Sequence, residues 1–244
     1  MPWCLMYYGL PRPVLCGISG IGLIAIVRSE RQGRPRRMAW AVFLAMFGWV
    51  AWGDVGWQFA GSSSGREATT LRVALWNTCH LPRGIEGAVA NITRFDADLI
   101  GLVEAGETTP ADLARWRDAL EARGLDYEVA STRPGMLWLS RRPAKIGEPI
   151  DLGITSDAVP LEFSHAGRPC RAVLVDIAAR VDVPRHPSFA KLAAQREAWR
   201  DEPLIVLGDF NTPPESTAFD VFDGWLRPTS SIQRAGYRPT WPVP

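Results

Sequence analysis

The distribution of apolar residues divides the chain into two regions. Residues 13–27 and 38–52 form two almost uninterrupted apolar segments. Each reaches the roughly 20 residues of a membrane span only when it is extended, the first across Arg12 and the second across Asp54. From Leu71 onward, short apolar runs alternate with polar stretches, which is the pattern of a folded globular domain.

The segment between the two apolar runs sets their expected orientation. Residues 28–37 contain five Arg and one Glu, and short basic loops of this kind stay in the cytoplasm. Trp49, Trp52 and Trp57 suit the aromatic belt at the opposite interface. We therefore predict that residues 1–60 form a transmembrane helical hairpin in the cell (inner) membrane. Two alternatives stay open: a pair of buried helices in a soluble protein, and a cleaved signal peptide, for which no A-x-A-like site follows the apolar run.

The composition of residues 61–70 separates this anchor from the rest of the chain. The segment is rich in Gly and Ser, as flexible linkers are. A single globular domain is then expected over residues 71–244, and the orientation of the hairpin places it outside the cytoplasm.

The pattern beyond the linker predicts a mixture of helices and strands. Apolar runs and amphipathic periods indicate strands at 71–76, 98–104, 127–131, 136–140, 170–177 and 203–209, and helices at 84–95, 110–124 and 188–199. Helices that alternate with strands early in the domain, followed by successive strands, are typical of an α/β protein with mixed sheets and helices packed outside.

Polar side chains stand where three of these strands end. Asn77 follows the first strand, Glu104 ends the second, and Asp209 with Asn211 follows the last. If the three strands are neighbours, these side chains converge on one rim of the sheet. Each alone is more often a turn former or a solvated strand end. Together they offer the oxygen ligands that Mg²⁺ prefers.

Three stretches of the domain carry a resemblance to a known family. "LRVALWNTCH", "FDADLIGLVEAGE" and "LIVLGDFNTPPES" resemble ordered signatures of the endonuclease/exonuclease/phosphatase superfamily, and the G-D-F-N element is the most specific of them. The resemblance runs from about Leu71 to the end and implies a DNase-I-like fold, a four-layer α/β sandwich. Within the superfamily, the chain is most similar to membrane-tethered bacterial members.

The resemblance also implies a role for each polar residue of the strand ends. Glu104 would be the principal metal ligand, and Asn77 would help to hold the metal or the phosphate. Asp209 would orient water or stabilise the leaving oxygen, and Asn211 would bind phosphate. The expected activity is Mg²⁺- or Mn²⁺-dependent hydrolysis of a phosphodiester or phosphomonoester.

The chain departs from the family pattern at two histidines. The family has a phosphate-binding His where this sequence ends a strand with Asp176, and Arg180 or Arg185 could replace it. The family's general base is a His in an Asp-His pair downstream of G-D-F-N, and this sequence reaches Pro244 without one. We therefore expect a fold that lacks its last strands, as in a product truncated at its C-terminus.

Three other histidines are candidates for the missing base. His80 lies three residues beyond Asn77 and close to the expected rim, whereas His165 and His186 lie away from it. If none of them serves, the alternative function is a catalytically inactive, membrane-anchored binding module that retains the fold.

The charge and the cysteine content of the chain indicate less about its function than these motifs do. Residues 71–244 carry twenty Lys and Arg against twenty-three Asp and Glu, which does not favour a nucleic-acid substrate over lipid head groups or small phosphoesters, although Arg141, Arg142 and Lys145 could form a local basic patch. Cys79 and Cys170 could form a disulfide or be two small buried side chains. Nothing in the pattern indicates an oligomeric state.

Overall fold

A computed structural model describes residue 44 and residues 70–180, 182–213 and 216–228. The apolar segments at 13–27 and 38–52 lie outside the described residues apart from residue 44, and residues 229–244 lie outside them entirely. Among the residues described, no helix combines the length and the apolarity needed to cross a bilayer. The membrane hairpin, the linker boundaries and the absence of the last strands therefore stay predictions.

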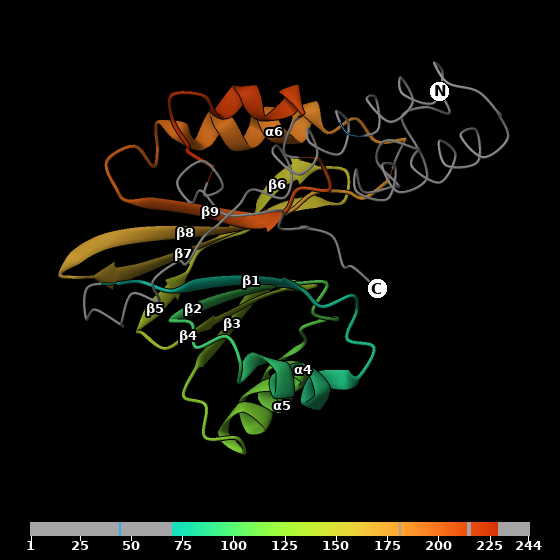
Figure 1. Cartoon of the computed structure of the whole chain (residues 1–244), viewed down its shortest axis with the longest axis vertical. Coiled ribbons are helices and arrows are strands. Elements are labelled where there is room, and N and C mark those ends of the chain that lie inside the picture. Colours follow the sequence, from blue (N-terminus) through green and yellow to red (C-terminus); the bar gives the residue numbers. More distant parts are fainter. Residues whose placement is uncertain (1–43, 45–69, 181, 214–215, 229–244) are drawn as a thin grey trace, which may run out of the picture. The chain divides into compact units, whose positions relative to one another are not determined.

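The first sheet contains the N-terminal half of the domain. Its strand order is β1 (Val73–Asn77), β2 (Leu99–Val103), β4 (Met136–Ser140) and β3 (Glu128–Arg133). β1 and β2 run parallel, and the other pairs are antiparallel. Two helices lie along one face of this sheet, as Figure 1 shows: α4 (Gly84–Ile92) and α5 (Pro110–Glu121).

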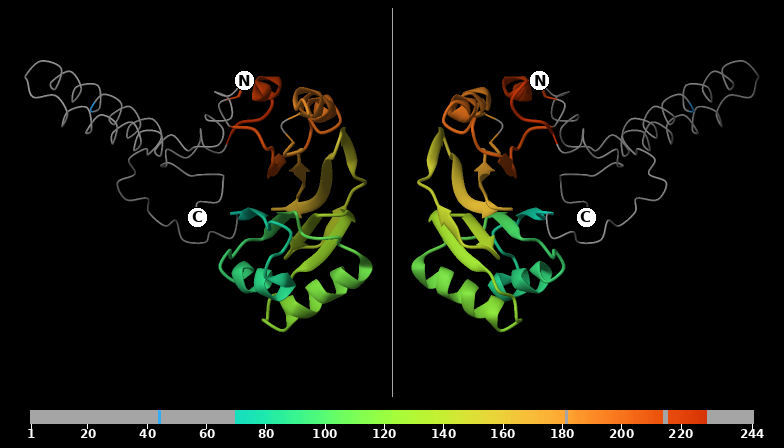
Figure 2. Two further views of the ribbon diagram at one scale, coloured as in Figure 1. Left: turned by 90° about the vertical axis from the view of Figure 1, so that its right-hand side faces the viewer. Right: turned by 90° about the vertical axis from the view of Figure 1, so that its left-hand side faces the viewer.

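The second sheet contains the C-terminal half. Its strand order is β5 (Ala144–Ile146), β7 (Ser156–His165), β8 (Arg168–Asp176) and β9 (Leu204–Asp209), with β6 (Ile150–Gly153) also paired to β7. β8 and β9 run parallel. The elements on its outer side are α6 (His186–Ala193), the 3₁₀ turn η1 (Ala194–Arg196) and the 3₁₀ helix η2 (Thr217–Phe222), seen at the top of both views in Figure 2.

The two sheets face each other across an apolar core. Trp138, Leu161 and Leu174 are buried between them, and the indole nitrogen of Trp138 donates a hydrogen bond to Val159 O in the other sheet (3.1 Å). A second core fills the space between the first sheet and its helices. The order helix, sheet, sheet, helix confirms the predicted four-layer α/β sandwich.

The predicted elements agree with the structure where capping and periodicity were clear. Helix α5 begins after Thr109, whose hydroxyl accepts from the amide of Asp112 while the Asp112 carboxylate accepts in return, and it ends three residues before Gly124. The longest element missing from the prediction is β7, because Pro160 interrupts its pattern. Pro160 lies between the segments that pair with β5 and with β6, so its missing N–H breaks neither ladder.

Candidate active site

Three of the predicted residues meet at one end of the sandwich. Asn77 ends β1, Glu104 follows β2, and Asp209 ends β9. The side-chain amide nitrogen of Asn77 donates to Glu104 Oε1 (2.9 Å) and to Asp209 Oδ2 (2.9 Å). The sequence placed them on one rim of a sheet on the condition that the three strands are neighbours. β1 and β2 are neighbours in the first sheet, whereas β9 belongs to the second, so the cluster lies across both sheets.

The loop after β1 fixes the orientation of the Asn77 amide. The backbone N–H of Cys79 donates to Asn77 Oδ1 (2.8 Å), so the amide nitrogen faces the two carboxylates. The Thr78 hydroxyl donates to Glu104 O (2.7 Å), which joins this loop to the one after β2. Glu104 has a φ of 55°, a conformation that costs energy for a residue other than glycine and is frequent at functional sites. The backbone thus holds Glu104 and Asn77 together.

The G-D-F-N element has a second network. The other carboxylate oxygen of Asp209 accepts from the backbone N–H of Asn211 (2.9 Å), and the Asn211 side-chain amide donates to Ile177 O (2.7 Å). The Asn211 amide therefore positions the loop after β8 against the loop after β9. Its predicted contact with phosphate stays a prediction.

Gly208 explains why a glycine precedes Asp209. A Cβ atom at this position would overlap the backbone of Val175 on the neighbouring strand. Only glycine lets β9 approach β8 this closely. Asp209 is consequently placed beside Asp176, with which it is in register.

Asp176 is the member of the site to which sequence reasoning gave no role. Burial, and to a smaller extent the negative charges of Asp209, Glu104 and Asp157, together raise its pKa to about 7. The available signal was its position, because it ends a strand as Asn77 and Asp209 do. Three carboxyl groups, those of Glu104, Asp176 and Asp209, therefore share this rim.

Only one of the three histidines lies at the rim. His80 Nε2 is 3.6 Å from Glu104 Oε2, and the His80 side chain is 80% exposed. His165 ends β7 and pairs with Arg168, at the opposite end of the strands from Asp157 and Asp176. His186 begins α6. His80 is thus the one histidine of the three that lies at this rim.

The two arginines proposed to replace the family histidine are engaged elsewhere. The Arg185 guanidinium donates to Ala178 O (3.3 Å) and Ala179 O (3.2 Å), and Arg180 pairs with Asp182.

Cys79 is exposed and Cys170 is buried, and both are free thiols, so no disulfide joins them.

The chemistry of the rim fits a hard cation. The rim presents the carboxyl oxygens of Glu104, Asp209 and Asp176, and Mg²⁺ is commonly held by one or two carboxylates with water and phosphate completing its shell. The neighbouring carboxylates contribute, after burial, to the raised pKa of Asp176, and a cation bound at the rim would offset their charge. Within the described part of the chain, no group of three or more His, Cys, Asp or Glu side chains is already arranged as a metal site.

Comparison with known proteins gives a family match. The Endonuclease/Exonuclease/phosphatase family model matches residues 74–243. No curated protein matches.

Several solved structures are similar at low identity. The human Nocturnin catalytic domain with bound sulfate is 18% identical (TM-score 0.49, covering 64% of this chain and 70% of that one). The Bacteroides thetaiotaomicron mannosyl-6-phosphatase is 16% identical (TM-score 0.48, 63% and 70%). A humanized D. rerio TDP2 is 15% identical (TM-score 0.46, 63% and 66%), so the chain spans about two thirds of that relative.

Proposed function

Because the chain belongs to the endonuclease/exonuclease/phosphatase family, we propose that it is a metal-dependent phosphoesterase that hydrolyses phosphodiester or phosphomonoester bonds. The observation that supports this best is the position of the Asn77 amide, which lies 2.9 Å from both Glu104 and Asp209. Asn77, Glu104 and Asp209 lie far apart in the sequence, at the ends of three different strands. Together they bring two carboxylates to one edge of the sandwich.

The residues of the rim would hold the cation and the substrate. Glu104 would be the principal ligand of Mg²⁺ or Mn²⁺, with Asn77 beside it, and the bound cation would polarise a phosphoryl oxygen for attack by water. Asn77 holds Glu104 and Asp209 at a fixed separation through its two hydrogen bonds. Asp209 would orient the attacking water or stabilise the leaving oxygen, and Asn211 would bind the phosphate.

The direct test is hydrolysis by the purified full-length chain. p-Nitrophenyl phosphate and bis-p-nitrophenyl phosphate separate monoesterase from diesterase activity. Turnover that needs Mg²⁺ or Mn²⁺ and stops with EDTA supports the proposal. Turnover that persists in EDTA, or none with any divalent cation and either ester, counts against it.

A second candidate function is a membrane-anchored binding module without catalysis. The observation that favours it is the exposure of His80, because an imidazole that is 80% exposed and 3.6 Å from Glu104 is weakly positioned as a base. General-base catalysis typically contributes ~10²- to 10⁴-fold. Turnover that falls about 100-fold in His80→Gln would identify His80 as the base and reject this candidate.

We also propose that the domain is tethered outside the cytoplasm. The two apolar segments, the Arg-rich loop at 28–37 and the interfacial tryptophans support this topology. Fusions of alkaline phosphatase and green fluorescent protein after Gly65 test it. An active phosphatase fusion agrees with the proposal, and a fluorescent fusion without phosphatase activity contradicts it.

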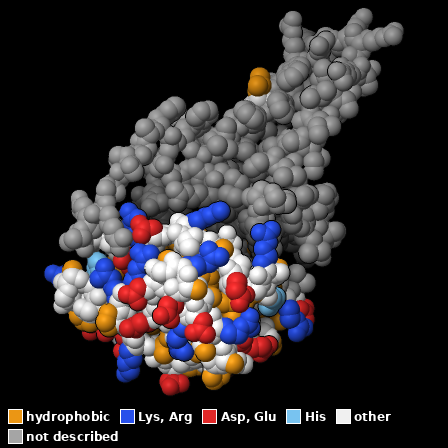
Figure 3. All heavy atoms as spheres, turned by 90° about the horizontal axis from the view of Figure 1, so that it is seen from below, with side chains coloured by type: hydrophobic (Ala, Val, Ile, Leu, Met, Phe, Trp, Pro, Cys, Tyr) orange, Lys and Arg blue, Asp and Glu red, His pale blue; other side chains and the backbone are white. Residues whose placement is uncertain are grey.

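We expect the substrate to be a small phosphoester or a lipid head group rather than a nucleic acid. Residues 71–244 have an excess of acidic side chains. On the face that carries α4 and α5, acidic and basic side chains are interspersed and form no broad basic surface, as Figure 3 shows. Proteins that bind nucleic acid obtain much of their affinity by neutralising several phosphates.

A further inference from the structure

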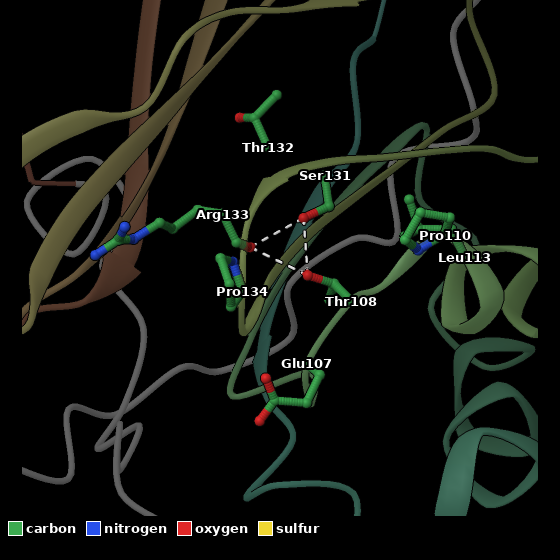
Figure 4. Close-up of a pocket in the computed structure, with 8 residues that line it drawn as sticks. All are labelled: Glu107, Thr108, Pro110, Leu113, Ser131, Thr132, Arg133 and Pro134. Carbon is green, nitrogen blue, oxygen red and sulfur yellow. Dashed lines mark hydrogen bonds between the residues drawn. The ribbon is translucent and has the colours of Figure 1, made fainter.

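A cavity of about 250 Å³ opens between the loop after β2, the start of α5 and the turn between β3 and β4. Its lining, drawn in Figure 4, is Glu107, Thr108, Pro110, Leu113, Ser131, Thr132, Arg133 and Pro134. We call this cavity the hydroxyl pocket, because three of its side chains are alcohols. None of its residues has a role in the site described above.

The hydroxyl pocket and the proposed active site share one short loop. Glu107, which lines the pocket, lies three residues beyond Glu104. The backbone N–H of Ala105 donates to Gly135 O (2.8 Å), which holds this loop against the β3–β4 turn.

The hydrogens of the three hydroxyl groups are already committed. The Thr108 hydroxyl donates to Arg133 O (3.2 Å). Ser131 has both Arg133 O (2.9 Å) and Thr108 Oγ1 (3.1 Å) as acceptors, and Figure 4 shows this triangle. Thr132 donates to Gly147 O (3.1 Å). A hydroxyl has one hydrogen and two lone pairs, so what these groups still offer a ligand is lone pairs.

The charges around the hydroxyl pocket also disfavour an anion. Arg133, the one basic residue of the lining, turns away and pairs with Asp157 (2.7 Å). Glu107 contributes an exposed carboxylate. The start of α5 would otherwise attract anions, but the Asp112 carboxylate already accepts from the Thr109 amide (3.2 Å) there.

We propose that the hydroxyl pocket binds an uncharged or cationic hydrogen-bond donor in the alcohol portion of the substrate. The substrate would then be a phosphoester of a polyol or an amino alcohol, whose hydroxyl or ammonium groups donate to Ser131 Oγ and to the Glu107 carboxylate. This inference depends on the proposed function only for the position of the phosphate. Binding of the donor group to the pocket does not require that the chain hydrolyses phosphoesters.

The first test measures binding without hydrolysis. myo-Inositol and ethanolamine, which carry no phosphate, are titrated into the full-length protein and followed by saturation-transfer NMR. We expect both to bind, Ser131→Val to weaken both about tenfold, and Glu107→Gln to weaken ethanolamine more than myo-inositol because a charge-assisted bond is lost. Ser164→Val, on an exposed part of β7, and Glu128→Gln, on an exposed part of β3, are matched controls that should bind as the unmodified chain does.

The second test compares substrates. The ratio of kcat/KM for phosphoethanolamine or myo-inositol 1-phosphate to that for p-nitrophenyl phosphate, which has no donor in its alcohol portion, should fall about tenfold in Ser131→Val through a higher KM. Equal binding of both probes to the unmodified chain and to Ser131→Val would overturn the pocket, as would inorganic phosphate binding that Ser131→Val removes. Probe binding without any phosphoester hydrolysis would instead contradict the proposed function alone.

Discussion

Asp176 and Asp209 lie directly opposite each other on the parallel strands β8 and β9, with both carboxyl groups at the same rim. Burial is the largest cause that raises the pKa of Asp176 to about 7, and the charge of Asp209 is the next. Asp176 therefore keeps its proton in the folded state at pH values below about 7.

The raised pKa of Asp176 predicts how the stability of the fold depends on pH. Between pH 3.8, the ordinary pKa of the carboxyl group, and about 7, the folded state binds more protons at Asp176 than the unfolded state does. Stability should therefore fall as the pH rises through this window. In Asp176→Asn the fall should disappear, with a gain at pH 8 of up to about 4 kcal/mol and little change at pH 4.

Denaturant unfolding in EDTA across this pH range measures the effect. The exposed Asp201→Asn is the control, and it should follow the unmodified chain. A parallel loss of stability with rising pH in the Asp176→Asn chain would show that another group is responsible.

The two hydrogen bonds of Asn77 predict a second effect. Asn77→Asp removes the donor between Glu104 and Asp209 and adds a negative charge, so the metal-free protein should lose about 1–3 kcal/mol. Mg²⁺ should restore more stability to this variant than to the unmodified chain, because the cation neutralises the added charge. Thermal unfolding with and without Mg²⁺ checks both statements, and an unchanged midpoint in EDTA would refute them.

Gly208 and Gly101 should differ in how much stability is lost when each is replaced by alanine. A Cβ at Gly208 meets the backbone of Val175, whereas a Cβ at Gly101 lies 2.7 Å from a terminal methyl of Leu174, which can move. Gly208→Ala should lower the free energy of unfolding by more than the ~1–3 kcal/mol typical of overpacking, and Gly101→Ala should lower it by an amount within that range. Gly208→Ala should also weaken cation binding in isothermal titration, because it displaces Asp209. Equal losses in the two variants would contradict this account of the glycine.

The sequence predicted the members of the rim better than their arrangement. Asn77, Glu104 and Asp209 each follow an apolar run, and the ends of parallel strands meet at one edge, so their proximity was predictable. Their distribution over two sheets was not, because strand periodicity does not specify which strands pair.

Two other features were beyond the reach of sequence pattern. The environment of Asp176 depends on partners up to 72 residues away, Glu104 being the most distant in the chain. The hydroxyl pocket is formed by residues of the loop after β2, the start of α5 and the end of β3 with its turn, and no periodicity or motif of these residues indicates that the three segments meet.

The most direct test of the proposed function is the effect of Glu104→Gln on metal-dependent hydrolysis of bis-p-nitrophenyl phosphate and p-nitrophenyl phosphate by the full-length chain, with exposed Glu128→Gln as the matched control. Loss of the principal ligand should lower the Mg²⁺-dependent rate at least about 100-fold, while the control keeps its rate and both variants unfold cooperatively. An unchanged rate in Glu104→Gln, with the same dependence on Mg²⁺, would contradict the assignment of this rim as the active site.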